Sequence, residues 1–420
     1  MNSVWPAAGV FFVTYALIVT ERMHRTMAAL LGGIAMILLG VLSQEQAFQS
    51  VDWNVIFLLV GMMIIANVLR ETGLFQWIAV QAVRMGHGDP VRILVILSLV
   101  TAVSSAFLDN VTIVVLVVPV TLFVTTNLRV SPLPFLISEI LASNIGGMAT
   151  LIGDPPNILI GSAASIDFLT FAANMTPISL IILIPFLGLA PFLFKADLPA
   201  GRHHSLDIEA LETSSLITDR QLLWKALVVL SGVILGFLVH GVLHLQPATI
   251  AMAGATVLLV WGRLDPHHML REVEWTTLFF FIGLFITVEA VVQAGIIEAA
   301  AQSALRLTSG DVRLTSMLIL WASAIASGIV DNIPYTATMI PLVESLGQTM
   351  PSEPLWWSLT MGADLGGNAT LVGASANVVV ASLAERSGYP IGFKRFLGYG
   401  LVTTVLSLLL ATGYLWLRYL

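Results

Sequence analysis

Apolar runs recur along the whole chain, and each is long enough, at about 20 residues, to span a hydrocarbon core of about 30 Å as a helix. Charged residues make up only 10% of the sequence. A soluble globular protein carries roughly 25%, because its surface faces water. A membrane barrel would show short segments of alternating hydrophobicity, and the sequence has none. The predicted fold class is therefore an all-α polytopic membrane protein.

The chain also contains an internal duplication. Three motifs of the first half return in the same order in the second half, and the spacing between the copies is nearly constant. The matched segments are 51–73 with 273–295, 105–120 with 327–342, and 143–157 with 363–377. We therefore predict two repeats, 1–195 and 224–420, joined by a polar cytoplasmic loop at 196–223.

The expected spans follow the same pattern in both halves. In the first half they are 5–20, 26–43, 53–70, an amphipathic segment at 74–86, an apolar pair at 91–107 and 111–126, an interrupted span at 134–164, and 170–194. In the second half they are 224–243, 246–263, 275–292, 312–348, 355–384 and 396–418. If the apolar pair is a re-entrant hairpin, each repeat crosses the membrane five times. The two repeats then have opposite orientations.

The basic residues predict the orientation. With five crossings in each repeat, fifteen of the eighteen Lys and Arg residues fall on the side of the connecting loop. Because positive residues stay cytoplasmic, both termini are expected outside, in a bacterial-type inner membrane. The segments 91–164 and 312–384 are the predicted transport elements, and the remaining spans form the predicted scaffold.

The two interrupted spans are the first candidate binding region. Segments 143–157 and 363–377 are rich in Gly, Asn and Thr, and the first contains Pro155 and Pro156, which cannot continue a helix at that depth. Irregular backbone within a membrane persists only where protein or a water-filled cavity satisfies it. Exposed N–H groups suit anions, and carbonyl and side-chain oxygens suit Na⁺. The candidate residues are Asn144, Gly146, Gly147, Thr150, Asp154, Asn157, Asp364, Gly366, Gly367, Asn368, Thr370 and Asn377.

The turns of the two hairpins are the second candidate region. Each carries Asp-Asn followed by a hydroxyl residue: Asp109, Asn110 and Thr112 in one half, and Asp331, Asn332 and Thr336 in the other. A carboxylate within an apolar run costs several kcal/mol unless it is paired or hydrated. Because Lys and Arg fall only at the ends of the predicted spans or between them, we expect Asp109, Asp154, Asp331 and Asp364 to lack cationic partners. An Asp at a turn can also simply cap a helix.

Two further acids, Glu139 and Glu289, lie in or near spans. For these two the sequence leaves a structural role and a proton-relay role equally open.

The motifs SNIGGMATLIGDPPN, LDNVTIVVLVVP, DNIPYTATMIP and GGNATLVGASAN resemble signatures of the ion transporter superfamily. The most similar branch holds arsenite permeases, NhaD-type Na⁺/H⁺ antiporters, plant silicon effluxers and the P protein. The resemblance implies a transport domain of hairpins and broken helices, a scaffold that forms a homodimer, and an elevator movement. Related dicarboxylate symporters carry Ser where this chain has Asp109 and Asp331. That departure favours a cation or a neutral hydroxide over an anion.

The sequence therefore predicts a secondary transporter and not an enzyme. The leading hypothesis is an H⁺- or Na⁺-coupled antiporter that exports Na⁺ or a neutral metalloid hydroxide such as arsenite or silicic acid. Asp109 and Asp331 would exchange protons against the cargo. The alternatives are a Na⁺-coupled symporter of a small anion such as a dicarboxylate, and a channel-like subunit of an ATPase.

The expected partners are a small inorganic ion or small-molecule substrate, membrane lipid and a second copy of the chain. No nucleic acid is expected. No cofactor is expected beyond the coupling ion, and no metal site other than Na⁺ at the residues named above. The absence of cysteine removes thiolate ligands and a thiol nucleophile.

Overall fold

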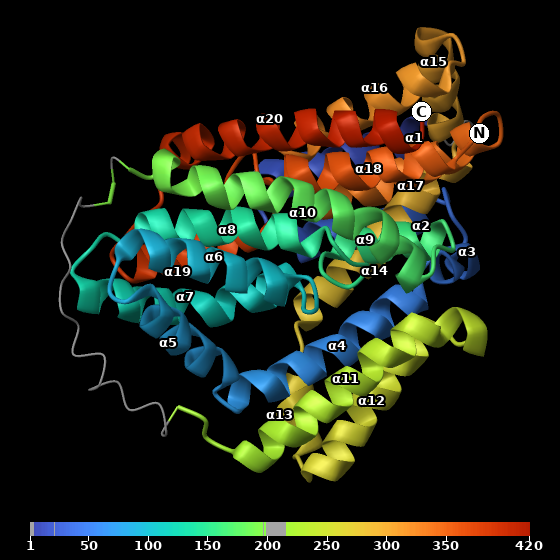
Figure 1. The fold of residues 1–420 in the computed structure, drawn as a ribbon. Helices are drawn as coiled ribbons and strands as arrows, with labels where there is room; N and C mark the ends of the chain where they lie inside the picture. Colours follow the sequence, from blue (N-terminus) through green and yellow to red (C-terminus); the bar gives the residue numbers. More distant parts are fainter. Residues whose placement is uncertain (1–3, 21, 196, 199–215) are drawn as a thin grey trace.

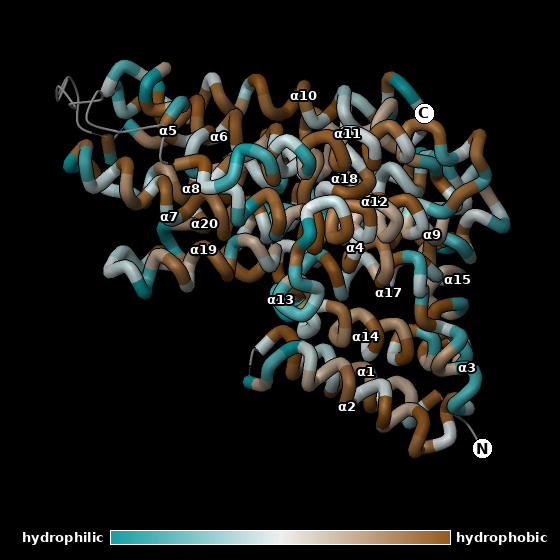
Figure 2. Tube along the Cα trace, turned by 90° about the horizontal axis from the view of Figure 1, so that it is seen from below, coloured by the Kyte–Doolittle hydropathy of each residue, from teal (hydrophilic) through white to brown (hydrophobic). Residues whose placement is uncertain are grey.

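The computed structural model describes residues 4–20, 22–195, 197–198 and 216–420. Most of the predicted connecting loop, 196–223, lies outside these residues. Within them the chain is helical and contains no strand. Figure 1 shows the helices running roughly parallel to one long direction, with the two chain ends at the same end of the molecule. Figure 2 shows apolar residues along the helices and hydrophilic residues concentrated in connections, as around α3 and α13.

Each repeat contributes ten helices to the described part of the chain, and the helices of the two repeats correspond one to one. The first repeat contains α1 (Val4–Thr20), α2 (Arg25–Leu38), α3 (Gln44–Gln49), α4 (Trp53–Glu71), α5 (Leu74–Gly86), α6 (Pro90–Ser105), α7 (Asn110–Leu128), α8 (Leu133–Gly147), α9 (Pro155–Ala163) and α10 (Phe168–Leu193). The second contains α11 (Arg220–Leu243), α12 (Pro247–Gly262), α13 (Pro266–Arg271), α14 (Trp275–Gln293), α15 (Ile296–Thr308), α16 (Val312–Ser327), α17 (Asn332–Gly347), α18 (Glu353–Gly366), α19 (Ser375–Arg386) and α20 (Phe393–Arg418).

Six helices are long and apolar enough to cross a membrane by length and composition: α4, α7, α10, α11, α14 and α20. Of these, α7 pairs with the shorter α6, whose 16 residues extend about 24 Å. The turn between α6 and α7 lies against the broken helices inside the molecule, since the Thr150 hydroxyl donates to the carbonyl oxygen of Ala106. The pair is therefore a re-entrant hairpin, and α16 with α17 forms its counterpart.

Each repeat thus crosses five times, through its first, second and fourth helices, its broken helix and its last helix. This confirms the predicted architecture of inverted repeats, hairpins and interrupted helices. The sequence prediction missed α15, the amphipathic counterpart of the predicted segment 74–86, although the repeat spacing that relates the other matched segments also relates these two.

The helices pack in groups. One group pairs α2 with α1 and α14, and another pairs α12 with α4 and α11. In Figure 1 α4, α11 and α12 lie together along the lower side, and in Figure 2 α1, α2 and α14 lie together along another edge. The hairpins pack on the broken helices, α6 on α8 and α16 on α18, while α10 and α20 pack on each other and on α8 and α18 respectively. The broken helices lie at the centre of this arrangement.

Candidate functional site

Both broken helices end at glycines, and a second helix passes very close to each of them. A Cβ at Gly146 would lie 2.1 Å from the carbonyl oxygen of Ala102 in α6, and a Cβ at Gly366 would lie 2.4 Å from that of Ala324 in α16. The helices then break: α8 ends at Gly147 and α9 begins at Pro155, while α18 ends at Gly366 and α19 begins at Ser375. The breaks predicted at 143–157 and 363–377 are therefore present.

One asparagine at each break donates hydrogen bonds to backbone carbonyls of that break. Asn157 Nδ2 donates to the carbonyls of Gly147 at 3.1 Å and Thr150 at 3.0 Å. Asn377 Nδ2 donates to the carbonyls of Gly367 at 2.7 Å and Thr370 at 2.9 Å. Both side chains are fully buried. These bonds satisfy backbone acceptors that the break removes from the helix ladder.

The turns of the hairpins are tied to the breaks. The Thr150 bond to the first hairpin has a counterpart in Thr370 Oγ1, which donates to Gly328 O at 2.6 Å. The backbone N–H of Asn332 also donates to Gly373 O at 3.0 Å. Hairpin and broken helix of each repeat therefore form one unit.

A buried carboxylate lies between the two hairpins. Asp154 Oδ2 accepts from Asn110 Nδ2 at 2.9 Å and from Asn332 Nδ2 at 3.2 Å. Asn110 and Asn332 occupy equivalent positions in the two repeats. Asp154 is only 1% exposed. One oxygen atom thus gathers amide donors from both halves of the molecule.

An asparagine cluster extends from this point. Asn144 Oδ1 accepts from Asn110 Nδ2 at 3.2 Å, and Asn144 Nδ2 donates to Asn368 Oδ1 at 2.9 Å and to Asn377 Oδ1 at 3.0 Å. All four side chains are buried. The structure therefore brings predicted residues of both repeats into one polar centre, the Asp154–Asn144 cluster.

The acids at the hairpin turns are helix caps. Asp109 accepts the backbone N–H groups of Val111 and Thr112 at 2.9 and 3.2 Å and a short bond from the Thr112 hydroxyl. Asp331 accepts the backbone N–H of Ile333 at 3.0 Å. This is the capping geometry that the sequence left as the alternative. Thr336 is buried in α17, and its hydroxyl has no partner in the described part of the chain.

The expectation that no cation faces these acids is wrong for Asp331. Arg25 at the start of α2 lies 3.4 Å from Asp331 Oδ2, contacts the Ser375 hydroxyl and stacks over the Phe280 ring. Ser375 Oγ in turn donates to Asp331 Oδ2 at 2.7 Å. The sequence places Arg25 in a loop because it precedes the predicted span 26–43, and nothing in its local sequence reveals so distant a partner.

The remaining acids differ in their surroundings. Asp364 is 1% exposed, and neither carboxylate oxygen has a hydrogen-bond partner among the described residues. Glu139 is buried, with Oε1 accepting from Thr121 at 2.5 Å. Glu289 lies at a partly exposed position and accepts from Gln293 at 2.8 Å. No three His, Asp or Glu residues of the described segments gather as a metal site would require.

Two cavities reach the hairpin turns from the predicted cytoplasmic side. A cavity of about 290 Å³ is lined by Arg25, Asp331 and Ser375, together with His24. A smaller one reaches Thr112 past Arg70 and Glu274. Glu274 lies just before α14, and burial raises the pKa of its carboxyl, as does the nearby Asp109 carboxylate. Both hairpin turns are therefore close to openings.

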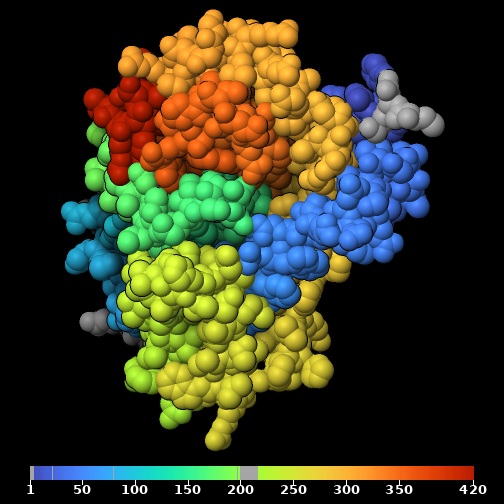
Figure 3. Space-filling model, turned by 90° about the vertical axis from the view of Figure 1, so that its right-hand side faces the viewer, coloured from blue at the N-terminus to red at the C-terminus, as the bar shows by residue number. Residues whose placement is uncertain are grey.

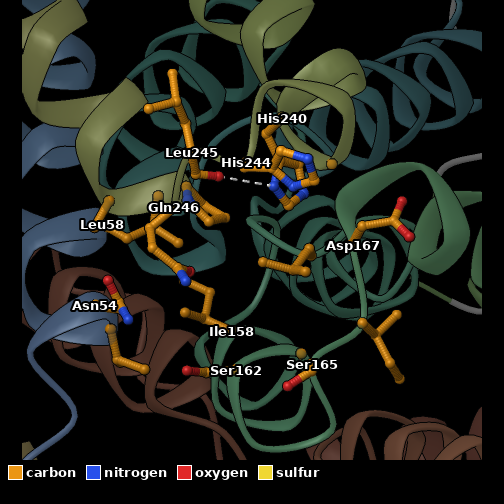
Figure 4. A pocket seen from close by; sticks show the side chains of 17 residues that line it. Asn54, Leu58, Ile158, Ser162, Ser165, Asp167, His240, His244, Leu245 and Gln246 are labelled. Carbon is orange, nitrogen blue, oxygen red and sulfur yellow. Dashed lines mark hydrogen bonds between the residues drawn. The ribbon is translucent and has the colours of Figure 1, made fainter.

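A larger cavity, of about 460 Å³, lies elsewhere. On the face shown in Figure 3, three of its walls meet: α4 in blue, the 158–167 segment in green and the 240–248 segment in yellow-green. Figure 4 shows His240, His244 and Gln246 facing it with Asn54 and Ser162. His240 has a partner for each ring nitrogen, since Nε2 accepts the Phe168 N–H at 3.1 Å and Nδ1 contacts Leu245 O at 3.2 Å. None of the predicted site residues lines it.

Together, inverted repeats of five crossings, re-entrant hairpins and a polar centre at paired helix breaks define a multi-pass membrane transporter. The sequence matches the model of the citrate transporter family over residues 15–362, so the chain belongs to that family, within the ion transporter superfamily.

The relatives cover the chain almost completely. A 46 kDa membrane protein of Mycobacterium leprae is 46% identical over 99% of this chain and 98% of its own length. An uncharacterized transporter of Mycobacterium tuberculosis is 46% identical over 98% of both chains. The human P protein is 35% identical over 97% of this chain, which spans 59% of that protein.

Two solved structures share the fold. The Alcanivorax borkumensis YdaH transporter superposes with a TM-score of 0.58 at 15% identity and covers 98% of this chain and 96% of its own. Neisseria gonorrhoeae MtrF, described with a class of antimetabolite efflux pumps, superposes with a TM-score of 0.63 at 12% identity over 92% of this chain and 84% of its own. At such identities the likeness extends to the fold alone.

Proposed function

We propose that this chain is an H⁺- or Na⁺-coupled antiporter that exports Na⁺ or a neutral metalloid hydroxide. The observation that supports this most directly is Asp154, a buried carboxylate held by Asn110 and Asn332 from the two hairpins. A ligand shifts a conformational equilibrium only through different affinities for the two states. Asp154 contacts both hairpins, so bound cargo or a proton at this position would change the contacts of both.

The moving part comprises the hairpins and broken helices, 91–164 and 312–384. We add α10 and α20, which the sequence assigned to the scaffold, because they pack on each other and on the broken helices. The scaffold is α1, α2, α4, α11, α12 and α14, and its outer face forms the homodimer contact. Elevator movement then carries the Asp154–Asn144 cluster along the scaffold.

The conformation described is inward-facing under this proposal. The hairpin α16–α17 enters from the outer side, yet Asp331 at its turn reaches Arg25 at the cytoplasmic end of α2. Such a contact fits a moving part that is displaced toward the cytoplasm. The cavity lined by Arg25 and Asp331 would be the route to the site. Both chain termini lie outside in this arrangement, in an inner membrane.

The alternative function is Na⁺-coupled symport of a small anion such as a dicarboxylate. Arg25 in the 290 Å³ cavity favours it, since guanidinium is a good carboxylate ligand, and so does the family's citrate transporter model. Against it, Asp331 already neutralises Arg25 at 3.4 Å.

The test uses purified protein in proteoliposomes with a pH-sensitive dye inside. We expect addition of Na⁺, Li⁺ or arsenite to dissipate an imposed pH gradient. Asp154→Asn should abolish this, although its amide oxygen can still accept from Asn110 and Asn332. Asp89→Asn, at the partly exposed start of the same hairpin, is the matched control and should retain activity.

Two outcomes would contradict the proposal. Full exchange in Asp154→Asn would remove Asp154 from coupling, and full exchange in both Asp109→Asn and Asp331→Asn would remove these two acids as proton carriers. Accumulation of labelled citrate driven by a Na⁺ gradient, with no response to the cations or arsenite, would establish the symporter instead.

A further inference from the structure

The pseudo-symmetry of the two breaks allows their hydrogen bonds to be compared atom by atom. Asn157 and Asn377 are equivalent, because each binds the carbonyls of the second glycine and of the threonine in an equivalent Gly-Gly-x-x-Thr segment. In both residues these two bonds consume both N–H groups of the amide. Only Oδ1 of each remains available for a further contact.

In Asn377 the remaining oxygen has a hydrogen-bond donor. Asn377 Oδ1 accepts from Asn144 Nδ2 at 3.0 Å. The residue equivalent to Asn144 in the second repeat is Asp364, because each lies two residues before the first glycine of its break. Asp364 neighbours the Asn157 side chain, as the symmetry requires. By symmetry, the mirror-image contact would join the Asp364 carboxyl group to Asn157 Oδ1.

As an ionised carboxylate, Asp364 cannot make that contact. Asn157 Oδ1 and both Asp364 oxygens are buried and have no partner among the described residues. Two acceptors without a proton between them repel, and each buried polar group without a partner is destabilising. A single proton on Asp364 removes the conflict, because the carboxylic acid then donates to Asn157 Oδ1 as Asn144 donates to Asn377.

We infer that the Asp364–Asn157 pair is a proton-binding site, occupied in this conformation by a proton on Asp364. Asp154 does not need this proton, since two amide donors already satisfy its Oδ2. Asp154 and Asp364 both lie buried at the helix breaks, and each is only 1% exposed. Two carboxylates in one buried site disfavour each other's ionisation, so one proton between them is the expected occupancy.

The position of the pair gives the proton a mechanical effect. Asp364 belongs to α18 of the second repeat and Asn157 to α9 of the first, and these helices pack on each other. Loss of the proton turns an attractive contact between the repeats into a repulsive one. Proton release therefore weakens the contact between α9 and α18 inside the moving part. This step rests on the proposed function, whereas protonation of Asp364 does not.

Infrared difference spectroscopy of the purified chain tests the inference without a transport assay. Between neutral and alkaline pH, the wild type should lose the carbonyl stretch of a protonated carboxylic acid. Asp364→Asn should lack this band and remain folded, because its amide can make the same contact that Asn144 makes. Asp154→Asn and Glu139→Gln, which remove the neighbouring buried acids, should retain it.

A full band in Asp364→Asn, its loss in Asp154→Asn, or its absence from the wild type would overturn the inference. If Asp364→Asn does not fold, ¹³C-aspartate labelling of wild type, Asp109→Asn, Asp154→Asn and Asp331→Asn assigns the band by elimination. A shifted band that persists in all three variants supports Asp364. Transport without the band would reject this site only, and the band without transport would reject the proposed function only.

Discussion

Removal of Arg25 should move the protein away from the conformation described here. The ion pair between Arg25 and Asp331 joins the scaffold to the hairpin α16–α17, and its groups lie 3.4 Å apart. Coulomb's law gives about 5 kcal/mol for that separation at an effective dielectric of about 20, and about 1 kcal/mol in water. The side chains are 32% and 15% exposed. Solvent screening and side-chain entropy therefore reduce the net value to about 1–2 kcal/mol.

A difference of that size changes the ratio of two conformations by about 5- to 30-fold. In Arg25→Gln, Asp331 retains the bonds from Ser375 and Ile333 but loses its counter-charge. We expect the hairpin to leave α2 more often. The variant Arg25→Lys should behave closer to wild type, because it restores the charge without the planar geometry.

The chain contains no cysteine, so two introduced ones report this movement directly. Spin labels can be attached at two exposed positions. His267→Cys in α13 lies on the side of the scaffold, and Ser387→Cys after α19 lies on the moving part. Electron–electron resonance should show a second distance whose population rises in Arg25→Gln. The matched control is Arg395→Gln, which breaks an ion pair of 2.6 Å with Asp197 inside the moving part.

The reasoning fails if Arg25→Gln gives the wild-type distance distribution. It fails equally if Arg395→Gln changes the distribution as much, because the effect would then reflect general loosening.

Two further predictions concern stability. Gly146→Ala should lower the free energy of unfolding by at least about 1–3 kcal/mol, because the new Cβ would lie 2.1 Å from the backbone of α6. The control Gly413→Ala should be neutral, because no atom lies within 4 Å of its Cβ. Equal melting temperatures of the two variants would refute the close-packing argument. Burial raises the pKa of Asp197, but bonds from Tyr399 and Arg395 outweigh it and lower the pKa overall. A depressed folded-state pKa contributes stability that is lost as pH falls through it. The melting-temperature gap between wild type and Asp197→Asn should therefore narrow below about pH 4, and a constant gap would contradict this.

The sequence was sufficient for the elements whose cause is local. Gly-Gly and Pro-Pro in apolar surroundings predict where α8 and α9 separate, and the nearly constant repeat spacing predicts the same break in α18. It was insufficient where the partner is distant. Asn157 is a candidate ligand by composition, yet its two N–H groups bind backbone of its own break. The sequence did not identify Arg25 as a partner of Asp331, because this contact depends on how the two repeats pack.

The hairpin acids illustrate the same limit. From its sequence, an Asp-Asn pair is equally consistent with a helix cap and with a proton carrier. Only the structure shows that Asp109 accepts the first N–H groups of α7. Capping leaves one of these acids, Asp331, beside a cation and the other beside Glu274. The equal roles proposed for Asp109 and Asp331 therefore meet unequal surroundings.

This inequality bears on how an inverted repeat transports. Under an elevator movement, the second end state is approximated by exchanging the roles of the repeats, so each contact in one state has a mirror contact in the other. The repeat spacing that relates Asp109 to Asp331 also relates Arg25 to Pro247, so the mirror of the Arg25–Asp331 pair would join Asp109 to Pro247. Proline carries no charge, so the proposed outward state would lack an equivalent ion pair. Under the proposed function, the duplicated chain would therefore prefer the inward state, and cargo or protons would supply the difference when the site moves outward.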